Sequence, residues 1–565
     1  SYMTQQTAGA AVRPRKGKPQ GQWAVYGKDP LNHSEELKQE DDGLNVKQRI
    51  IDVYSKQGFG AITHDDLFQR MKWAGVYTQR RQGIEGHRTG QISDMELADE
   101  YFMMRIRIDG GALTTEQLRV IADISNEFGR GTADITDRQN IQLHWVRVED
   151  IPEIWRRLEA IDLSSTTACG DAPRVIMGSP VAGIAADEII DPTPVIAEIK
   201  RRYVGNQEFT NLPRKWKSAI TGHPSLDVVH EINDISFVGV VHPELGAGYD
   251  LWVGGGLSTA PRLAERVGVF VTEEQAPDVW AAVTSIFRDY GYRRNRARAR
   301  LKFLIADWGV EKFRQVLQDE YLGYELPDGP APAKASTSDL PGDHVGVHDQ
   351  KDGRKYVGFA GKVGRVSGDL LHTYADLAEK AGSQRVRLTP HQKLLILDVE
   401  PDKVEDLIDA MREFNMDARP GPFRRSTMAC TGIEYCKLAF VETKNLATHA
   451  IDELEKRFAH RDDVPPIQLN LNGCPNSCAR IQTADIGLKG QMIKGEFGFQ
   501  VHLGGGLASA DRDDPGLGRT VRGLKVTSED LVDYVERVLT RYLDTRAEGQ
   551  TFGEWAHATD EENLK

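Results

Sequence analysis

The sequence repeats itself across a proline- and alanine-rich stretch near its middle, residues 327–345. Three short patterns of the first part return in the second part, in the same order and about 250 residues later. The matched pairs are 252–258 with 502–508, 135–139 with 388–392, and Asp234-Ile235 with Asp485-Ile486. One glycine-rich match arises easily by chance, but three in order at a nearly constant offset indicate an internal duplication. We therefore expect two homologous halves related by a pseudo-two-fold axis.

Each half opens with the same alternation of expected strands and helices. Residues 102–108 and 140–146 are strand-like, and an amphipathic helix capped by Thr114 or Thr115 lies between them. Its apolar face is formed by Leu118, Ile121, Ile124 and Phe128. Further elements are expected at 151–161 (helix), 355–364 (strand), 369–381 (helix), 393–399 (strand) and 401–414 (helix). This pattern predicts an α+β fold with a ferredoxin-like half-domain in each repeat.

Composition limits what the chain can bind. The 71 basic and 84 acidic residues give a net charge of −13, which argues against a nucleic-acid-binding protein. The sequence has no apolar run of about 18 residues that could span a membrane, and its start has no secretory signal. Five cysteines are too few for a disulfide scaffold. We expect a cytoplasmic monomer without nucleic-acid or membrane partners.

Two segments carry little pattern of their own. Ser1 and Tyr2 before Met3 have the look of an expression scar, which would make Met3 the natural start. Residues 4–22 are polar without periodicity and predict a mobile or wrapping tail. The strongly basic run at 293–300 is interpreted as one solvated helix face.

Four of the five cysteines fall within 49 residues, as Cys430, Cys436, Cys474 and Cys478. Their spacing is C-x5-C and C-x3-C, with 37 residues between the pairs. Four thiolates suit a [4Fe–4S] cluster, because soft sulfur binds iron well and offsets its charge. Structural zinc is the alternative, but zinc-binding pairs usually have two to four intervening residues, so five is unusual. The turn at 472–478 should point backbone N–H groups at inorganic sulfide.

These motifs resemble those of the siroheme-dependent sulfite and nitrite reductases, in particular the single-chain, ferredoxin-dependent branch. The resemblance runs from about Gly21 to Gly549 and rests on the cysteine spacing with Asn-Gly-Cys-Pro-Asn at 472–476. It implies six-electron reduction of sulfite to sulfide at a siroheme coupled to a [4Fe–4S] cluster. It also implies that the Cys478 thiolate bridges the cluster and the siroheme iron.

The resemblance assigns roles to basic and amide residues as well. Siroheme carries eight carboxylates and the substrate is an oxyanion, so burying both requires fixed cations. The residues implied to face the substrate are Arg105, Arg174, Lys215 and Lys217, and those implied to hold siroheme are Arg138, Gln142, Arg214 and Gln392. Arginine offers a planar fork to oxyanion oxygens, and lysine can also donate protons. Arg138 and Gln142 are four apart on one expected strand, so they should face the same side.

The duplication and the resemblance together suggest a domain plan. It comprises two ferredoxin-like half-domains and two α/β domains that bind siroheme and the cluster. The expected segments are an N-terminal tail and wrapping extension (1–95), the first half-domain (96–165), a siroheme- and substrate-binding domain (166–326), a linker (327–345), the second half-domain (346–420), a cluster- and siroheme-binding domain (421–549) and a C-terminal tail (550–565).

The fifth cysteine, Cys169, lies beside residues 170–174, close to the expected active site. It ligates nothing in this scheme. The simplest interpretation is a small buried side chain. The alternative is a thioether crosslink to a nearby aromatic residue such as Tyr77, since such links form near redox metals.

The sequence leaves alternatives open for the substrate and for the electron donor. A ferredoxin–nitrite reductase would use the same scaffold to make ammonia. Among relatives the position of Lys217 tends to be Asn in nitrite reductases and Lys in sulfite reductases, so Lys217 favours sulfite, with nitrite as a second substrate. A structural iron–sulfur or zinc scaffold is the non-enzymatic alternative. The chain has no flavin module, and 254–256 is no dinucleotide loop. Reduced ferredoxin is therefore the expected donor, docking on a basic patch such as Arg293, Arg294 and Arg296.

Overall fold

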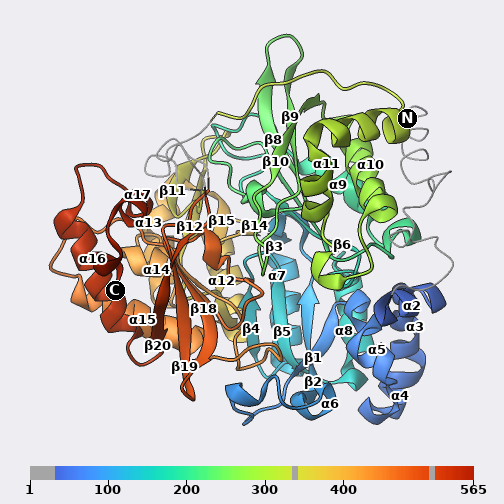
Figure 1. Cartoon of the computed structure of the whole chain (residues 1–565), viewed down its shortest axis with the longest axis horizontal. Helices are drawn as coiled ribbons and strands as arrows, with labels where there is room; N and C mark the ends of the chain where they lie inside the picture. Colours follow the sequence, from blue (N-terminus) through green and yellow to red (C-terminus); the bar gives the residue numbers. More distant parts are fainter. Residues whose placement is uncertain (1–31, 334–341, 508–515) are drawn as a thin grey trace.

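A computed structural model describes residues 32–333, 342–507 and 516–565 (Figure 1). The expected expression scar and the expected tail at 4–22 lie outside the described residues, as do residues 334–341 of the expected linker. Within the described ranges, no helix is both long and apolar enough to cross a membrane. The α+β fold with an internal duplication is confirmed, and each half contributes two five-stranded sheets.

The first ferredoxin-like half-domain is built from local signals that the sequence carries plainly. Its elements are β2 (Ala98–Ile106), α7 (Thr115–Phe128), β4 (Thr132–Ile135), β5 (Ile141–Val146) and α8 (Ile151–Glu159). Thr114 caps α7 in a capping box with Gln117, which satisfies backbone donors at both positions. Leu118, Ile121 and Ile124 are buried on the face of α7 that packs into the core.

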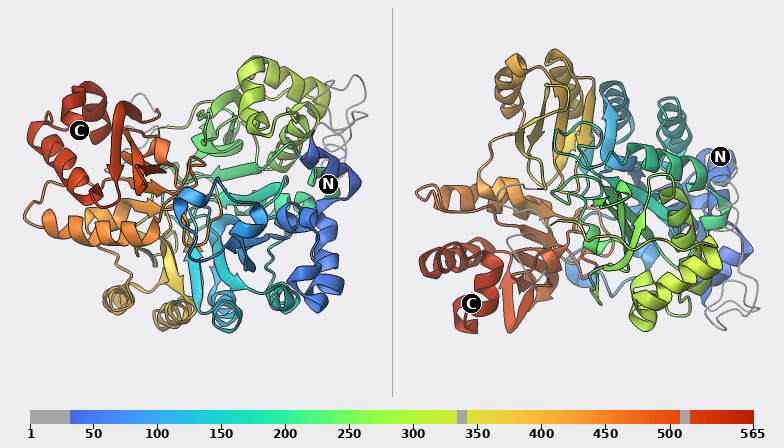
Figure 2. Two further views of the ribbon diagram at one scale, coloured as in Figure 1. Left: turned by 60° about the horizontal axis from the view of Figure 1, so that its bottom comes forward. Right: turned by 90° about the horizontal axis from the view of Figure 1, so that it is seen from above.

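The second half-domain repeats this order. Its elements are β12 (Lys355–Phe359), α12 (Gly368–Lys380), β14 (Arg385–Leu388), β15 (Leu394–Val399) and α13 (Val404–Arg412). The strand expected over 355–364 ends earlier, and the chain turns into a short separate strand, β13 (Arg365–Ser367). Helices α7, α8, α12 and α13 lie side by side along one face of the molecule, seen end-on at the bottom of the left view in Figure 2.

The two half-domains exchange edge strands. Strand β13 of the second half pairs antiparallel with β4 of the first. In return, β3 (Ala112–Thr114) of the first half pairs antiparallel with β14 of the second. The sheets therefore run β1-β2-β5-β4-β13 and β11-β12-β15-β14-β3, where β1 is Val76–Arg80 and β11 is Gly346–Asp349. One hydrophobic core spans both half-domains, so they form a single packed unit.

The other two sheets are each half parallel and half antiparallel. In the first half the order is β10 (Glu265–Val271), β9 (Gly246–Val253), β8 (Ile235–His242), β7 (Trp216–Thr221) and β6 (Pro173–Gly178). In the second it is β16 (Thr427–Ala429), β17 (Leu469–Asn472), β18 (Ile486–Ile493), β19 (Glu496–Leu503) and β20 (Arg519–Thr527). The helices of these domains are α9 (Thr193–Tyr203), α10 (Ala276–Tyr290), α11 (Leu301–Val316), α15 (Lys444–Arg457) and α16 (Leu531–Thr545).

The last residues differ from the expected tail. Residues 550–565 contain helix α17 (Phe552–Ala558) and a final turn that ends at Leu564. Phe552, Trp555 and Leu564 are buried in the core that also includes residues of strands β17 to β20 and helices α15 and α16. The aromatic residues of this segment supply apolar surface that a solvated tail would leave exposed.

The N-terminal extension connects the first half to the cysteine-bearing loops. Its helices include α2 (His33–Glu40), α3 (Val46–Arg49), α5 (His64–Phe68) and α6 (Asp94–Leu97). The indole of Trp73 donates to the Thr210 carbonyl at 2.8 Å. The buried Arg80 donates from its backbone to the Tyr435 carbonyl at 2.6 Å, and from its guanidinium to the Ala439 carbonyl at 3.0 Å. These bonds cover the loop that carries Cys436.

Candidate active site

A cavity of about 410 Å³ lies where the two halves and the N-terminal extension meet. Every side chain that the sequence analysis assigns to the substrate, siroheme, the cluster or the possible crosslink lines it: Tyr77, Arg105, Arg138, Gln142, Cys169, Arg174, Arg214, Lys215, Lys217, Gln392, Cys430, Cys436, Cys474 and Cys478. Residues more than 400 positions apart are thus brought to one place. The roles implied for them remain predictions, but their convergence supports a shared site.

Two neighbouring parallel strands position the cysteines. Cys430 directly follows β16, and Cys474 and Cys478 follow β17, so both cysteine segments leave the same edge of the sheet. The Gly473 backbone N–H donates to the Cys430 sulfur at 3.1 Å. The Asn472 side chain donates to the Cys474 carbonyl at 2.6 Å and accepts from the Ala479 backbone at 2.9 Å. Asn472 therefore fixes the turn between the last two cysteines.

The environment of the thiols suits a metal cluster. Burial raises the pKa of Cys430 to about 12, and the neighbouring Cys478 adds to this effect. Burial likewise raises the pKa values of Cys474 and Cys436. As thiolates these groups would repel one another unless a cation lay among them.

The spacing of the sulfurs separates iron–sulfur from zinc. Within the described ranges, no three of the four sulfurs lie within 4.8 Å of one another. Sulfurs on one zinc ion, each about 2.3 Å from it, would lie about 3.8 Å apart. The wider arrangement favours a cluster with several metal atoms.

The four residues implied to face the substrate converge from three strands of the first half. Arg105 lies on β2, Arg174 on β6, Lys217 on β7, and Lys215 just before β7. Burial lowers the pKa of Lys215 to about 7, helped by Arg300 and Arg174. Burial also holds the pKa of Lys217 well below its usual value, with further contributions from Lys215 and Arg138. Such crowded buried cations are stable only if anions bind among them.

Buried hydrogen-bond donors without partners also indicate that an anionic group binds in the cavity. The Nε atoms of Arg105 and Arg138 and the Nη1 atom of Arg480 are buried and have no hydrogen-bond partner among the described residues. Buried donors of this kind are rare in proteins and call for an acceptor. A cofactor with several carboxylates would supply those acceptors, so the cavity fits siroheme.

The residues implied to hold siroheme lie on both halves, and one expectation about them is wrong. Arg138 does not share a strand with Gln142, because it lies in the turn between β4 and β5. Its guanidinium donates to the Asn233 side chain at 3.1 Å, and burial lowers its pKa to about 9. Gln392 donates to the Ala429 carbonyl at 2.9 Å, and Arg214 donates to the Arg296 carbonyl at 2.6 Å.

The basic run at 293–300 is not a solvated helix face. Arg293 is buried and pairs with Glu35 at 3.1 Å. Arg296 pairs with Asp171 at 2.8 Å and Arg300 with Asp234 at 2.9 Å, and both arginines line the cavity. Arg293 therefore holds the N-terminal extension and Arg296 the cavity wall, and Arg294 is the exposed one of the three arginines considered as a docking patch.

Several residues that line the cavity could not be identified from the sequence. They include Lys38, Lys72, Trp73, Lys444 and Arg480. Arg480 stands two residues after Cys478, which was the only available signal for it. Lys38 pairs with Asp171 at 3.0 Å, a partner 133 positions away. Such long-range pairing leaves no local pattern.

Comparisons with known proteins agree with this site. Residues 169–326 and 421–565 match the family described as "Nitrite and sulphite reductase 4Fe-4S domain". Residues 95–161 and 348–414 match the "Nitrite/Sulfite reductase ferredoxin-like half domain". The chain belongs to the nitrite and sulphite reductase family. It therefore carries the cofactors of this family, a [4Fe–4S] cluster and siroheme.

Individual relatives are similar over nearly the whole chain. A "Sulfite reductase [ferredoxin] 1" of Mycolicibacterium paratuberculosis is 54% identical over 561 residues, covering 98% of this chain and 100% of that protein. The structure of the Mycobacterium tuberculosis NirA protein has 53% identity and a TM-score of 0.93, covering 97% of this chain and 100% of that one. An assimilatory ferredoxin-dependent nitrite reductase of Haloferax mediterranei is 35% identical, covering 90% and 88%.

The fifth cysteine of this reductase lies in the same cavity as Tyr77. Burial opposes ionisation of Cys169, but Arg174, Arg105 and Lys72 outweigh it and lower its pKa to about 7. The Tyr77 hydroxyl donates to Gln142 at 2.8 Å and accepts from Arg105 at 3.2 Å. A thiol with this pKa is more reactive than a plain buried side chain. The Tyr77–Cys169 crosslink stays a prediction.

Proposed function

We propose that this protein reduces sulfite to sulfide with six electrons taken from reduced ferredoxin. The observation that carries the proposal is the group of four cations, Arg105, Arg174, Lys215 and Lys217, that line one cavity with the cysteines. Sulfite at neutral pH carries up to two negative charges, and a group of fixed cations stabilises such an anion more than a singly charged one. The names of the relatives above support the same substrate and donor.

When bound, siroheme coupled to the cluster would supply the electrons and a redox-active iron for the reduction of sulfite. The chain contributes charge, orientation and protons. Arg105 and Arg174 each offer a planar fork for two oxyanion oxygens. Arg174 is oriented by donating from Nε to the Gly170 carbonyl at 3.0 Å, which leaves its two Nη groups for a ligand. Arg105 is oriented by the Tyr77 hydroxyl.

Lys215 and Lys217 are suited to proton delivery. Three sulfite oxygens must leave as water, so acids are needed beside the reacting atom. Their lowered pKa values mean that a proton added when the anion binds is readily given up again. The Lys217 backbone donates to the Asp234 carboxylate at 2.8 Å, which anchors the start of β7 and so the direction of its side chain.

The substrate preference can be measured directly. With reduced ferredoxin as donor, we expect kcat/KM for sulfite to exceed that for nitrite by at least about tenfold. Sulfite can carry a second negative charge, which the second of the two lysine ammonium groups would stabilise. Steady-state assays of both substrates on one enzyme preparation give this ratio. A ratio below one would make nitrite reduction to ammonia the main activity.

Ferredoxin docking should occur where the cluster is closest to the surface. Lys72 is exposed, Lys437 lies next to Cys436, and the side chain of Leu438 is 58% exposed. Burial lowers the pKa of Lys437 to about 8, and Lys72 contributes to this shift, so the two ammonium groups act on one another. We propose these three residues as the centre of the docking surface. A basic centre with one exposed apolar side chain is typical of a short-lived, charge-steered complex.

The docking proposal predicts a salt effect. Raising the salt from about 0.05 to 0.5 M shortens the Debye length to below ~5 Å and should weaken ferredoxin binding at least about tenfold. The charge reversal Lys437→Glu should reduce both the affinity and its salt dependence. The matched control is Lys456→Glu on α15, at an exposed position away from the cysteine loops. An affinity unchanged by salt would rule out charge steering.

The cellular setting and assembly follow as part of the proposal. A chain with five cysteines, four of them spaced for a cluster, suits a reducing compartment. We propose a cytoplasmic monomer that binds neither nucleic acid nor membranes.

A further inference from the structure

The loop after β7 in the first half has the same design as the cysteine loop after β17 in the second. Both connect neighbouring parallel strands over the same number of residues, 221–235 and 472–486. Leu226 and Ser477 have φ values of 52° and 57°, and Val229 and Arg480 have φ values of 45° and 57°. Each loop then makes one turn of 3-10 helix, His230–Ile232 or Ile481–Thr483. The two loops therefore correspond residue by residue.

This correspondence places other ligand types where the second half has cysteines. His223 occupies the place of Cys474, and Asp227 occupies the place of Cys478. The spacing H-x3-D thus repeats C-x3-C. Imidazole and carboxylate suit single divalent transition-metal ions, whereas four thiolates suit an iron–sulfur cluster.

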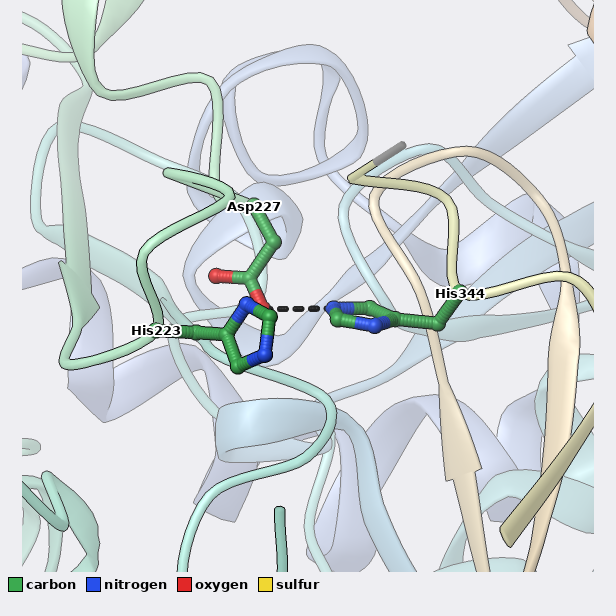
Figure 3. A group of neighbouring side chains, drawn as sticks. All are labelled: His223, Asp227 and His344. Atoms are coloured by element: carbon green, nitrogen blue, oxygen red, sulfur yellow. Dashed lines mark hydrogen bonds and ion pairs between the residues drawn. The ribbon is translucent and has the colours of Figure 1, made fainter. Parts of the chain in front are cut away.

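A third ligand comes from the other half. His344 lies just before β11, and its Nε2 atom is 2.7 Å from the Asp227 carboxylate. Within the described ranges, His223, Asp227 and His344 are the one set of potential metal ligands whose ligand atoms all lie within 4.8 Å of one another. Their side chains are only 1%, 0% and 2% exposed. Figure 3 shows the carboxylate reaching the ring of His344, with the ring of His223 beside it.

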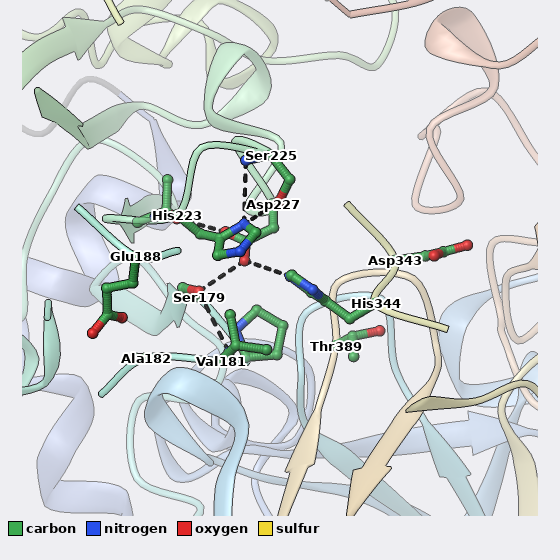
Figure 4. Close-up of polar contacts among 12 residues, drawn as sticks. Ser179, Val181, Ala182, Glu188, His223, Ser225, Asp227, Asp343, His344 and Thr389 are labelled. Carbon is green, nitrogen blue, oxygen red and sulfur yellow. Dashed lines mark hydrogen bonds and ion pairs between the residues drawn. The ribbon is translucent and has the colours of Figure 1, made fainter. Parts of the chain in front are cut away.

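Neighbouring polar groups hydrogen-bond to these three side chains and fix their orientation. Asp187 lies 2.8 Å from Nε2 of His223, which favours a proton on Nε2 and the Nδ1 lone pair as the ligand. The Ser225 hydroxyl lies 2.7 Å from Nδ1 and the Ser225 backbone N–H donates to Nδ1 at 3.2 Å, so a bound metal ion would replace these two contacts. Tyr356 lies 3.4 Å from Nδ1 of His344, on the side away from Asp227. The Ser179 hydroxyl donates to the Asp227 carboxylate at 2.7 Å (Figure 4), and Thr221 donates to its other oxygen.

The charges of the group favour a cation. Asp227 contacts His344, and Asp187 contacts His223, so two carboxylates lie against the two imidazoles. A divalent cation would balance both carboxylate charges.

We propose that His223, Asp227 and His344 bind one divalent transition-metal ion of the zinc class. Two imidazoles and one carboxylate, with water as a fourth ligand, are a common zinc set. The ion would fasten the segment that follows the linker to the loop of the first half. The same loop reaches the cofactor cavity through Val229 and Ile232, so the ion would also hold part of the cavity wall in place.

Metal analysis of the purified holoenzyme tests this proposal without any activity assay. After exposure to zinc and removal of loosely bound ions, the wild type should hold about one zinc per chain by mass spectrometry. Asp227→Asn, which keeps the shape of the side chain, and His344→Gln should each hold less than about 0.2. The iron content should be equal in all three proteins, which shows that folding and the cluster are intact.

The matched control is His348→Gln. The ring of His348 is 6.4 Å from that of His344, but it donates to or accepts from no member of the group. This variant should keep the full zinc content. In competition with a coloured chelator, the wild type should bind zinc at least about a hundredfold more tightly than Asp227→Asn. A wild type that binds less than about 0.2 zinc, or variants that bind as much as the wild type, would leave only a proton-sharing His–Asp pair and overturn the proposal.

Discussion

Replacing Cys478 with serine should abolish the reduction of sulfite to sulfide. Cys478 is the most exposed of the four cluster cysteines and lines the cavity, whereas Cys474 is buried. We propose it as the residue that couples the cluster to siroheme. A serine hydroxyl is a harder and more weakly acidic ligand than a thiol, so it binds iron poorly. We expect sulfite turnover below about one thousandth of the wild-type rate, a loss of more than ~4 kcal/mol.

The measurement is steady-state sulfide formation with reduced ferredoxin, together with iron and siroheme content. Cys169→Ser is the matched control, because Cys169 lines the same cavity but is not part of the C-x5-C and C-x3-C pattern. It should retain the iron of the cluster. A Cys478→Ser protein with undiminished sulfite reduction would show that the thiolate does not couple the two cofactors.

Replacing Lys217 with asparagine should lower the rate of sulfite reduction much more than the rate of nitrite reduction. Lys217 is half-buried beside Lys215 and Arg138. Desolvation and these two cations hold its pKa well below the usual value, so an anion is needed to keep it charged. Sulfite satisfies that need better than nitrite because it carries more charge. If one charge-assisted hydrogen bond is worth about 1.5–3 kcal/mol, kcat/KM for sulfite should fall about ten- to a hundredfold. Nitrite should lose much less, or improve.

Siroheme content distinguishes the alternatives for Lys217. If the residue only neutralises a siroheme carboxylate, bound siroheme should drop and both substrates should suffer together. Equal losses in kcat/KM for sulfite and nitrite would remove the main reason for assigning sulfite as the substrate. Unchanged siroheme with a selective loss of sulfite turnover would place Lys217 at the substrate.

Local sequence signals were enough for the half-domains and for the cysteine loops. The cap expected at Thr114 or Thr115 and the apolar spacing of α7 are encoded within one or two turns, and the structure confirms the spacing and places the cap at Thr114. The exchange of β3 and β13 could not be foreseen, because three-residue strands carry no periodicity. The prediction of a solvated helix face at 293–300 failed for a different reason. A local charge pattern does not show that Glu35, Asp171 and Asp234 pair with these arginines in the fold.

Residues of the site could be predicted only where they lie close together in the sequence and form a motif. The cysteines stand in two short segments, and the basic quartet was carried over from a family resemblance. His223, Asp227 and His344 escaped notice because the third ligand lies 117 positions from the second. No spacing rule connects them, and only the fold brings them together.

The reciprocal exchange of edge strands has a consequence for the ancestry of this chain. An exchange in which each half gives the other the same strand is what a two-fold symmetric homodimer makes when identical subunits swap an element. Joining two such subunits into one polypeptide keeps the interface but removes the demand that both copies be identical. Each copy of the loop could then change by itself. The copy in the second half carries two of the four cluster cysteines, Cys474 and Cys478, and the copy in the first half carries an imidazole and a carboxylate at the same two places.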